Sequence, residues 1–324
     1  MEIVAQKTYL CKCQFDIDKI CDILVILQTR NGGEILPDII FPNLGITLNN
    51  INTVVFTIFG FDIYWYAIMV VIGIIAGVYF GAVFAPKRTG QDPNLYLDFA
   101  LFVVPACIVG ARLFYVIFAW DATWTFVRIF DTRQGGLAIY GVVIAAILTA
   151  FIFCRIKKVN FLHFADTGIV GLIIGHAIGR FGNFINREAF GGYTDGLFAM
   201  QLRLDQVHNL STVTQEMRDN AIIRGDVTYI SVHPTFLYEA AILLTLFVAL
   251  NLYRKHKKFN GELLAYYFLI YGVARFFIEG LRTDQLLLAG TNLSISMIMS
   301  VVIAILGLGY LIYGYAKHFR KTAK

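Results

Sequence analysis

Seven mostly apolar stretches limit the fold of this chain more than any other feature of its sequence. Each is close to the ~20 residues that a helix needs to cross a hydrocarbon layer of about 30 Å. Only 15% of the residues are charged, against about a quarter in soluble domains. The sequence therefore predicts an all-α polytopic membrane protein with about seven transmembrane helices. The expected spans are 63–85, 98–120, 136–154, 167–186, 235–253, 261–280 and 294–316.

Basic residues follow every second expected span. Because positively charged loops stay in the cytoplasm, an odd number of spans puts the C-terminus in the cytoplasm and the N-terminus outside. The residues that set this orientation are Lys87, Arg88, Arg155, Lys157, Lys158, Arg254, Lys255, Lys257, Lys258, Lys317, Arg320, Lys321 and Lys324.

The spans divide the chain into five parts. We expect an extracytoplasmic N-terminal segment at 1–62, of which 48–61 is aromatic and suits the membrane interface. Residues 187–232 are polar and too long for a tight turn, so they are expected to form a small extracytoplasmic cap. The other parts are spans one to four (63–186), spans five to seven (233–316) and a basic cytoplasmic tail (317–324).

Four charged residues fall inside the spans, near their outer ends: Arg112, Arg180, Arg275 and Glu279. Each costs at least ~2.5–3.5 kcal/mol near the centre of a membrane, so each needs a reason. One interpretation is a structural ion-pair network or side chains that reach the interface. The other is a pocket for a phospholipid phosphate, which arginine can bind with two parallel hydrogen bonds. Three arginines at one depth, with no surplus of carboxylates, favour the phosphate pocket.

Tyr271, Arg275 and Glu279 are spaced four residues apart and form one stripe along a helix. Glu279 either shields the charge of Arg275 or orients its guanidinium toward a ligand. Both can hold, because a carboxylate that orients an arginine also keeps it from bulk water.

The densest polar patch ends the fourth span. Arg180, Asn183 and Asn186 lie about one helical turn apart, and Glu188 follows. Amides in a membrane need a partner, either another helix or a ligand. The patch is therefore a candidate binding site, with Glu188 as a cap or an ion-pair partner.

Other polar positions have weaker assignments. The paired glycines before Tyr140 suggest a re-entrant turn, which would face Tyr140 toward the same outer cavity. An interfacial tyrosine is the alternative for Tyr140 and for Tyr66. His176 is expected to be a packed polar residue, and Glu239 falls one to two turns inside the fifth span.

The five cysteines, an odd number, show neither a disulfide framework nor the spacing of a zinc site. We expect no metal, no cofactor and no nucleic-acid partner.

Several runs together resemble one bacterial family, the phosphatidylglycerol–prolipoprotein diacylglyceryl transferases. The resemblance covers about residues 36–316. The runs are Tyr64-Trp-Tyr66, Gly110-Ala-Arg112, Gln134-Gly-Gly-Leu-Ala-Ile-Tyr140-Gly141, Arg180-Phe-Gly-Asn-Phe-Ile-Asn186 with Glu188 and Gly191, His233-Pro-Thr-Phe-Leu-Tyr-Glu239, and Tyr271-Gly-Val-Ala-Arg-Phe-Phe-Ile-Glu279.

The resemblance implies a seven-span enzyme of the bacterial inner membrane, with a cavity open to lipid and to the precursor protein. It implies transfer of diacylglycerol from phosphatidylglycerol to the lipobox cysteine of a prolipoprotein, which forms a thioether and releases glycerol-1-phosphate. The family often has His where this chain has Tyr140, and residues 1–35 have no counterpart.

We therefore expect Arg180, Arg275 and Tyr140 to be catalytic. The residues expected to bind phosphatidylglycerol are Tyr66, Arg112, Arg180, Asn183, Asn186, Glu188, Tyr271, Arg275 and Glu279. Two alternatives stay open. An anion transporter would line a path with the same arginines, but the sequence has no inverted repeat. Another phospholipid headgroup enzyme would use the lipid without modifying a peptide.

Overall fold

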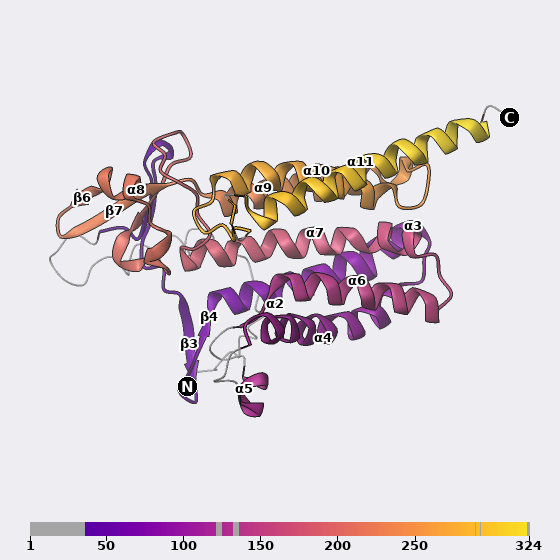
Figure 1. Ribbon diagram of the computed structural model, residues 1–324, viewed down its shortest axis with the longest axis horizontal. Helices are drawn as coiled ribbons and strands as arrows, with labels where there is room; N and C mark the ends of the chain where they lie inside the picture. The colour runs from indigo at the N-terminus through magenta and orange to yellow at the C-terminus, as the bar shows by residue number, and fades with distance from the viewer. Residues whose placement is uncertain (1–35, 121–124, 132–135, 289, 292, 323–324) are drawn as a thin grey trace, which may run out of the picture.

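A computed structural model of the chain describes residues 36–120, 125–131, 136–288, 290–291 and 293–322. Seven of its helices are long and apolar enough to cross a membrane, which confirms the expected number. They run side by side in one bundle (Figure 1). The first is α2 (Trp65–Val78), which continues through a π-helical turn (Tyr79–Phe84) into α3 (Ala85–Thr89). The others are α4 (Pro93–Phe118), α6 (Ile139–Ile156), α7 (Phe161–Asn186), α9 (Thr235–Tyr253), α10 (Glu262–Leu281) and α11 (Ile295–Thr322).

Short polar signals begin and end these helices. Asp92 accepts a hydrogen bond from the Asn94 amide and caps α4, and Asn160 caps α7 through the His163 amide. Arg187 ends α7 in the left-handed conformation, with φ of 53°. Two small helices lie outside the bundle: α5 (Phe126–Phe130) and α8 (Gln215–Asp219).

Helix α7 is the most buried of the seven spans. It packs along α2 through glycines on both helices. A Cβ atom on Gly73 would lie 2.8 Å from the carbonyl oxygen of Gly175, and one on Gly77 would lie 2.9 Å from that of Gly171. Small residues allow two backbones to approach this closely within a membrane. On its other side α7 contacts α9 and α10, so it connects the two halves of the bundle.

The cap contains a β-sheet that the all-α prediction did not include. The strands β1 (Ile39–Phe41), β2 (Ile46–Leu48), β5 (Met200–Arg203), β6 (Ile222–Arg224) and β7 (Val227–Val232) form one antiparallel sheet in the order β2-β1-β5-β7-β6. The N-terminal segment and the cap, expected as separate parts, are thus joined by the pairing of β1 with β5. Their buried side chains pack onto Phe236 in the first turn of α9.

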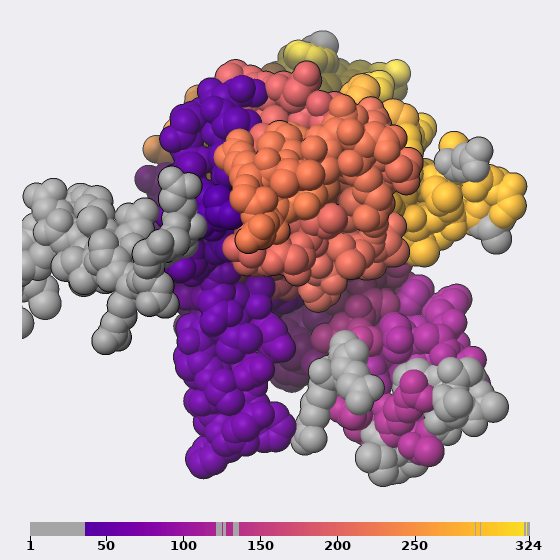
Figure 2. Space-filling view, turned by 90° about the vertical axis from the view of Figure 1, so that its left-hand side faces the viewer, coloured from indigo at the N-terminus to yellow at the C-terminus, as the bar shows by residue number. Residues whose placement is uncertain are grey.

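A second, two-stranded sheet extends away from the cap, as Figure 2 shows in violet. It is the hairpin of β3 (Val54–Ile58) and β4 (Phe61–Tyr64), which leads directly into α2. Phe59 at its tip is 96% exposed. An apolar side chain so exposed fits the interfacial position that the sequence predicts for this segment.

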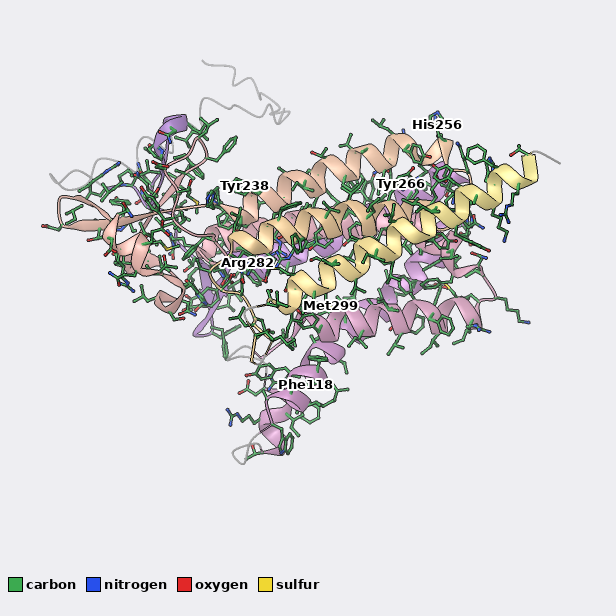
Figure 3. The ribbon with its side chains drawn as sticks, turned by 45° about the horizontal axis from the view of Figure 1, so that its top comes forward. Phe118, Tyr238, His256, Tyr266, Arg282 and Met299 are labelled. Carbon is green, nitrogen blue, oxygen red and sulfur yellow. The ribbon has the colours of Figure 1, made fainter. Side chains whose placement is uncertain are left out.

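Within the described residues, the four groups of basic residues follow helices that end away from the cap, so they lie at one end of the bundle (Figure 1). Figure 3 shows His256 at this end and Arg282 near the cap. Basic residues therefore do collect at one end of the bundle. Which end faces the cytoplasm stays a prediction.

Candidate active site

Glu239 is the centre of a polar cluster inside the bundle, close to the cap. It lies on α9 and is 2% exposed. Its Oε1 accepts hydrogen bonds from Arg180 of α7 at 2.8 Å and from the Tyr271 hydroxyl of α10 at 2.9 Å. Its Oε2 accepts one from Arg275 at 2.8 Å. One buried carboxylate therefore holds two arginines that come from different helices.

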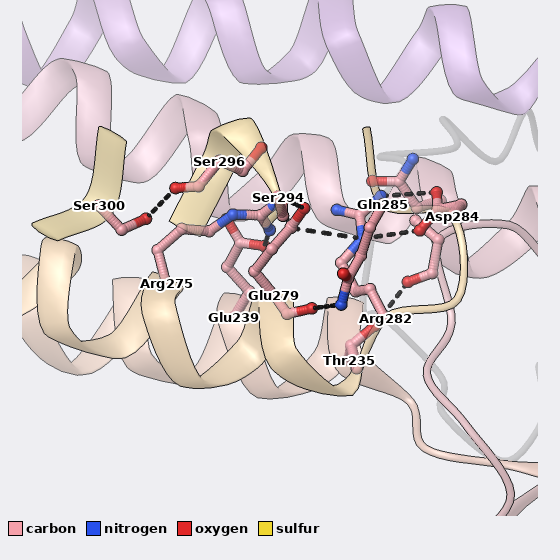
Figure 4. A network of polar contacts seen from close by, with 12 residues as sticks. Thr235, Glu239, Arg275, Glu279, Arg282, Asp284, Gln285, Ser294, Ser296 and Ser300 are labelled. Carbon is pink, nitrogen blue, oxygen red and sulfur yellow. Dashed lines mark hydrogen bonds and ion pairs between the residues drawn. The ribbon is translucent and has the colours of Figure 1, made fainter. Parts of the chain in front are cut away.

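Arg275 is fixed from two sides. It donates to Glu239 and, within α10, to Glu279 one turn further along (Figure 4). Glu279 is itself buried and accepts a hydrogen bond from the Ser294 hydroxyl at 2.8 Å. The stripe predicted from the spacing of Tyr271, Arg275 and Glu279 is present, and both of its ends meet other elements.

Arg180 forms an ion pair with one carboxylate, whereas Arg275 pairs with two. Nη1 of Arg180 donates to Asn183 at 3.3 Å, and its Nη2 lies 3.0 Å from His176 Nε2, which is also 3.3 Å from Glu239. Within the described residues, its buried Nε has no hydrogen-bond partner. An unfilled donor on a buried guanidinium leaves room for an acceptor supplied by a ligand.

The end of α7 and the turn after it form a second polar group. Asn183 donates to Glu188 at 2.9 Å, and Asn186 approaches the same oxygen at 3.5 Å. The patch predicted around Arg180 is thus one connected network: Arg180 contacts Asn183, and Asn183 contacts Glu188.

Tyr66 at the start of α2 packs directly on α7 at Gly182. A Cβ atom added to Gly182 would lie 2.7 Å from Cδ2 of the Tyr66 ring. A larger residue at position 182 would displace the tyrosine, so this glycine sets how closely Tyr66 approaches the network.

Gly191 and Gly192 attach the cap to the helices beside the cluster. The Gly191 amide donates to the His233 carbonyl, and the Gly192 amide donates to the Leu281 carbonyl, both at 2.8 Å. A Cβ atom on Gly191 would lie 2.8 Å from the same Leu281 oxygen. Next to it Arg282 makes two hydrogen bonds to Asp284, at 2.8 and 2.7 Å (Figure 4).

Arg112 and Tyr140 have other surroundings. The Arg112 guanidinium donates to the backbone carbonyls of Arg128, Ile129 and Gly136. Tyr140 has a ring contact with Phe114 at 6.2 Å and no hydrogen bond to any described residue. No contact among the described residues joins either side chain to Glu239. The turn expected before Tyr140 falls largely on 132–135, outside the described residues.

The carboxylates do not outnumber the arginines, as expected, but Arg180 and Arg275 are both paired. Glu239 and Glu279 together pair with Arg180 and Arg275. In the sequence, Glu239 is only a carboxylate near the end of a hydrophobic span. Its contacts in the fold show that it lies at the centre of the polar cluster. His176, expected as a packed polar residue, also lies in this cluster.

The profile of the prolipoprotein diacylglyceryl transferase family matches residues 53–313. This chain belongs to that family. A family relative from Finegoldia magna, named phosphatidylglycerol–prolipoprotein diacylglyceryl transferase, is 39% identical over 256 residues, which are 78% of this chain and 92% of the relative. Relatives of the same name from Clostridioides difficile and Enterococcus faecalis are 38% and 40% identical, over 78% and 79% of this chain and 90% and 87% of their own lengths.

Membership of the family agrees with the seven spans: the chain is a multi-pass membrane protein with bacterial relatives. All the residues of the Glu239 cluster fall within the matched region of the family profile.

Proposed function

We propose that this chain transfers the diacylglyceryl group of phosphatidylglycerol to the lipobox cysteine of a prolipoprotein. The observation that carries the proposal is the pair of buried arginines, Arg180 and Arg275, held by Glu239. Their side chains are 18% and 11% exposed, so they are largely removed from water. The names of the family relatives give the same reaction.

The reaction is an alkyl transfer to sulfur. The cysteine thiol of the prolipoprotein loses its proton, because the thiolate is the nucleophile. Its sulfur forms a bond to the glycerol carbon that carries the phosphate. The bond between that carbon and the phosphate oxygen breaks, and glycerol-1-phosphate leaves. Charge builds on the leaving oxygen, so the enzyme must stabilise a phosphate anion.

We assign the phosphate to Arg180 and Arg275. Guanidinium groups that are fixed before the substrate arrives need no reorganisation as charge develops. Glu239 supplies this rigidity, since its oxygens accept from both arginines and from Tyr271. A carboxylate engaged in this way is a poor base, so Glu239 is a positioning residue and not the proton acceptor.

The remaining site residues have supporting roles in the proposal. Asn183 and Asn186, oriented through Glu188, bind polar groups of the lipid headgroup, and Glu279 holds Arg275. Tyr66, Tyr271 and Arg112 complete the binding residues. Tyr140 donates a hydrogen bond to the headgroup or relays a proton. The thiolate can also form directly beside the arginines.

We further propose that the cap and residues 1–62 face the outside of the bacterial inner membrane and that residues 317–324 form a cytoplasmic tail. The cluster then lies at outer-leaflet depth, where a secreted precursor and a phospholipid can both reach it.

Mass spectrometry of a lipobox peptide tests the proposal. Purified protein is incubated with the peptide in micelles of phosphatidylglycerol, with a peptide in which serine replaces the cysteine as the control. We expect the cysteine peptide alone to gain the mass of one diacylglyceryl group. Turnover of phosphatidylglycerol without this gain indicates another headgroup enzyme, and anion flux in liposomes without it indicates a transporter.

A further inference from the structure

A basic cavity of about 230 Å³ lies at the end of the bundle away from the cap. It opens between α3, the start of α7 and the end of α9. Its lining residues are Arg88, Thr89, His163, Asn251, Arg254, Lys255 and Lys257. Figure 3 places His256, which lies in the same turn as Arg254, far from Arg282 and the candidate active site. The cavity is therefore separate from the Glu239 cluster.

Arg254 is the most unusual residue of the cavity. It is 6% exposed, and its Nε, Nη1 and Nη2 are buried with no hydrogen-bond partner among the described residues. A buried charged group left unsatisfied costs more than a neutral one. All five donor hydrogens of the Arg254 guanidinium thus lack an acceptor among the described residues.

The surrounding charges do not supply that acceptor. The carboxylate of Asp166 makes no hydrogen bond or ion pair with Arg254: it accepts from Lys257 Nζ at 3.0 Å and from the amides of Gly261 and Leu264 at 2.7 and 3.1 Å. Arg88, Arg254 and Lys255 form no ion pair with any described residue. Three cations and no free carboxylate give the cavity a positive potential.

We propose that this cavity binds a phosphate group, with Arg254 as the buried ligand and Arg88 and Lys255 at the rim. Guanidinium donors match the geometry of phosphate oxygens. The volume equals nearly eight water molecules at about 30 Å³ each, enough for a phosphate with part of its ester. Basic pockets between membrane helices accept anionic lipid headgroups. A free phosphate offers the same chemistry, so the experiment separates the two sources.

Thermal unfolding in a neutral detergent tests the proposal without using transfer activity. The pocket variant Arg88→Gln/Lys255→Gln changes two exposed side chains, so it should fold. Its control, Lys87→Gln/Lys317→Gln, loses the same charge at the same end of the bundle but outside the cavity. Inorganic phosphate is added in one arm and phosphatidic acid in the other, against chloride of equal ionic strength.

We expect a rise in Tm of at least about 3 °C for the wild type and the control, and a rise less than half as large for the pocket variant. A rise in the inorganic phosphate arm identifies a site for free phosphate; a rise with phosphatidic acid alone identifies a headgroup site. An equal rise in all three proteins, or none in either arm, overturns the proposal. The volume-matched variant Arg254→Met provides a second test, because it must lose the response while its Tm without ligand does not fall.

Discussion

Two arginine sites are buried at opposite ends of this helix bundle, and they differ in what surrounds the guanidinium. Near the cap, Arg180 and Arg275 share the carboxylate of Glu239, and Glu279 adds a second one for Arg275. At the other end, Arg254 is more deeply buried, yet no described residue accepts a hydrogen bond from its guanidinium.

The difference shows two ways of keeping a positive charge out of water. A built-in carboxylate fixes the arginine and keeps it charged, which suits a site where the charge must act on a reaction. An unpaired guanidinium gains most from a ligand that brings its own negative charge. The paired arginines stabilise the protein without a ligand. The unpaired arginine makes the free energy of unfolding depend on a bound ligand.

Replacing the shared carboxylate should have the largest effect. Glu239→Gln leaves Arg180 without a carboxylate and Arg275 with Glu279 alone, so we expect the free energy of unfolding to fall by about 3–5 kcal/mol. Misplaced arginines should also slow peptide lipidation by at least about 100-fold. Denaturation in micelles and the peptide assay measure the two effects. Asp205→Asn, which removes an exposed carboxylate in the cap, is the control and should change stability by less than about 1 kcal/mol.

An arginine-to-methionine substitution at each end of the bundle compares the contribution of the two arginine sites to stability. Arg180→Met removes a paired charge and should lower the free energy of unfolding by about 3 kcal/mol. Arg254→Met removes an unpaired one and should leave it unchanged or raise it in phosphate-free buffer. Chemical denaturation of both variants measures the contrast. Equal losses would show that Arg254 has a stabilising partner.

A smaller effect is expected at Tyr140, which makes no described contact with the cluster. If its hydroxyl donates one hydrogen bond to the lipid headgroup, Tyr140→Phe should slow lipidation by up to about tenfold. Tyr313→Phe, at an exposed position near the far end of α11, should have no effect. Full turnover by Tyr140→Phe would remove this residue from the chemistry.

The smallest predicted effect concerns pH. Burial lowers the pKa of His233, whose backbone joins the cap to α9 beside the cluster. As pH falls from 7.5 to 5.5, unfolded chains take up a proton at a pKa of about 6.5 more readily than the folded protein does, so Tm should fall. In His233→Asn this fall should be smaller by about 1–2 °C. His256→Asn, on the exposed basic end, should retain the full fall.

Much of this molecule could be predicted from its sequence. The seven spans follow from hydropathy and length, and each observed helix overlaps its predicted span. The stripe of Tyr271, Arg275 and Glu279 and the contact of Arg180 with Asn183 follow from helical spacing, because residues three or four apart lie close together. These features are local, and a single chain segment determines them.

The features that could not be predicted bring distant segments together. Glu239 meets Arg180 and Arg275 across 59 and 36 residues of chain, and nothing in its own segment distinguishes it from an ordinary carboxylate near a span end. The pairing of β1 with β5 is likewise set by tertiary packing. Arg112 was grouped with the other arginines by depth, but depth alone does not specify which face of a helix meets which neighbour.

In the proposed mechanism, the Arg180 guanidinium, held by Glu239, binds the phosphate that leaves during transfer. Single-turnover lipidation by Arg180→Lys tests it most directly, because lysine keeps the charge and loses the forked geometry. Arg203→Lys, the same substitution in the cap, serves as the control. We expect a rate at least about 100-fold below wild type for Arg180→Lys and a normal rate for the control. A rate within about threefold of wild type for Arg180→Lys would show that the forked guanidinium is not needed for the leaving phosphate.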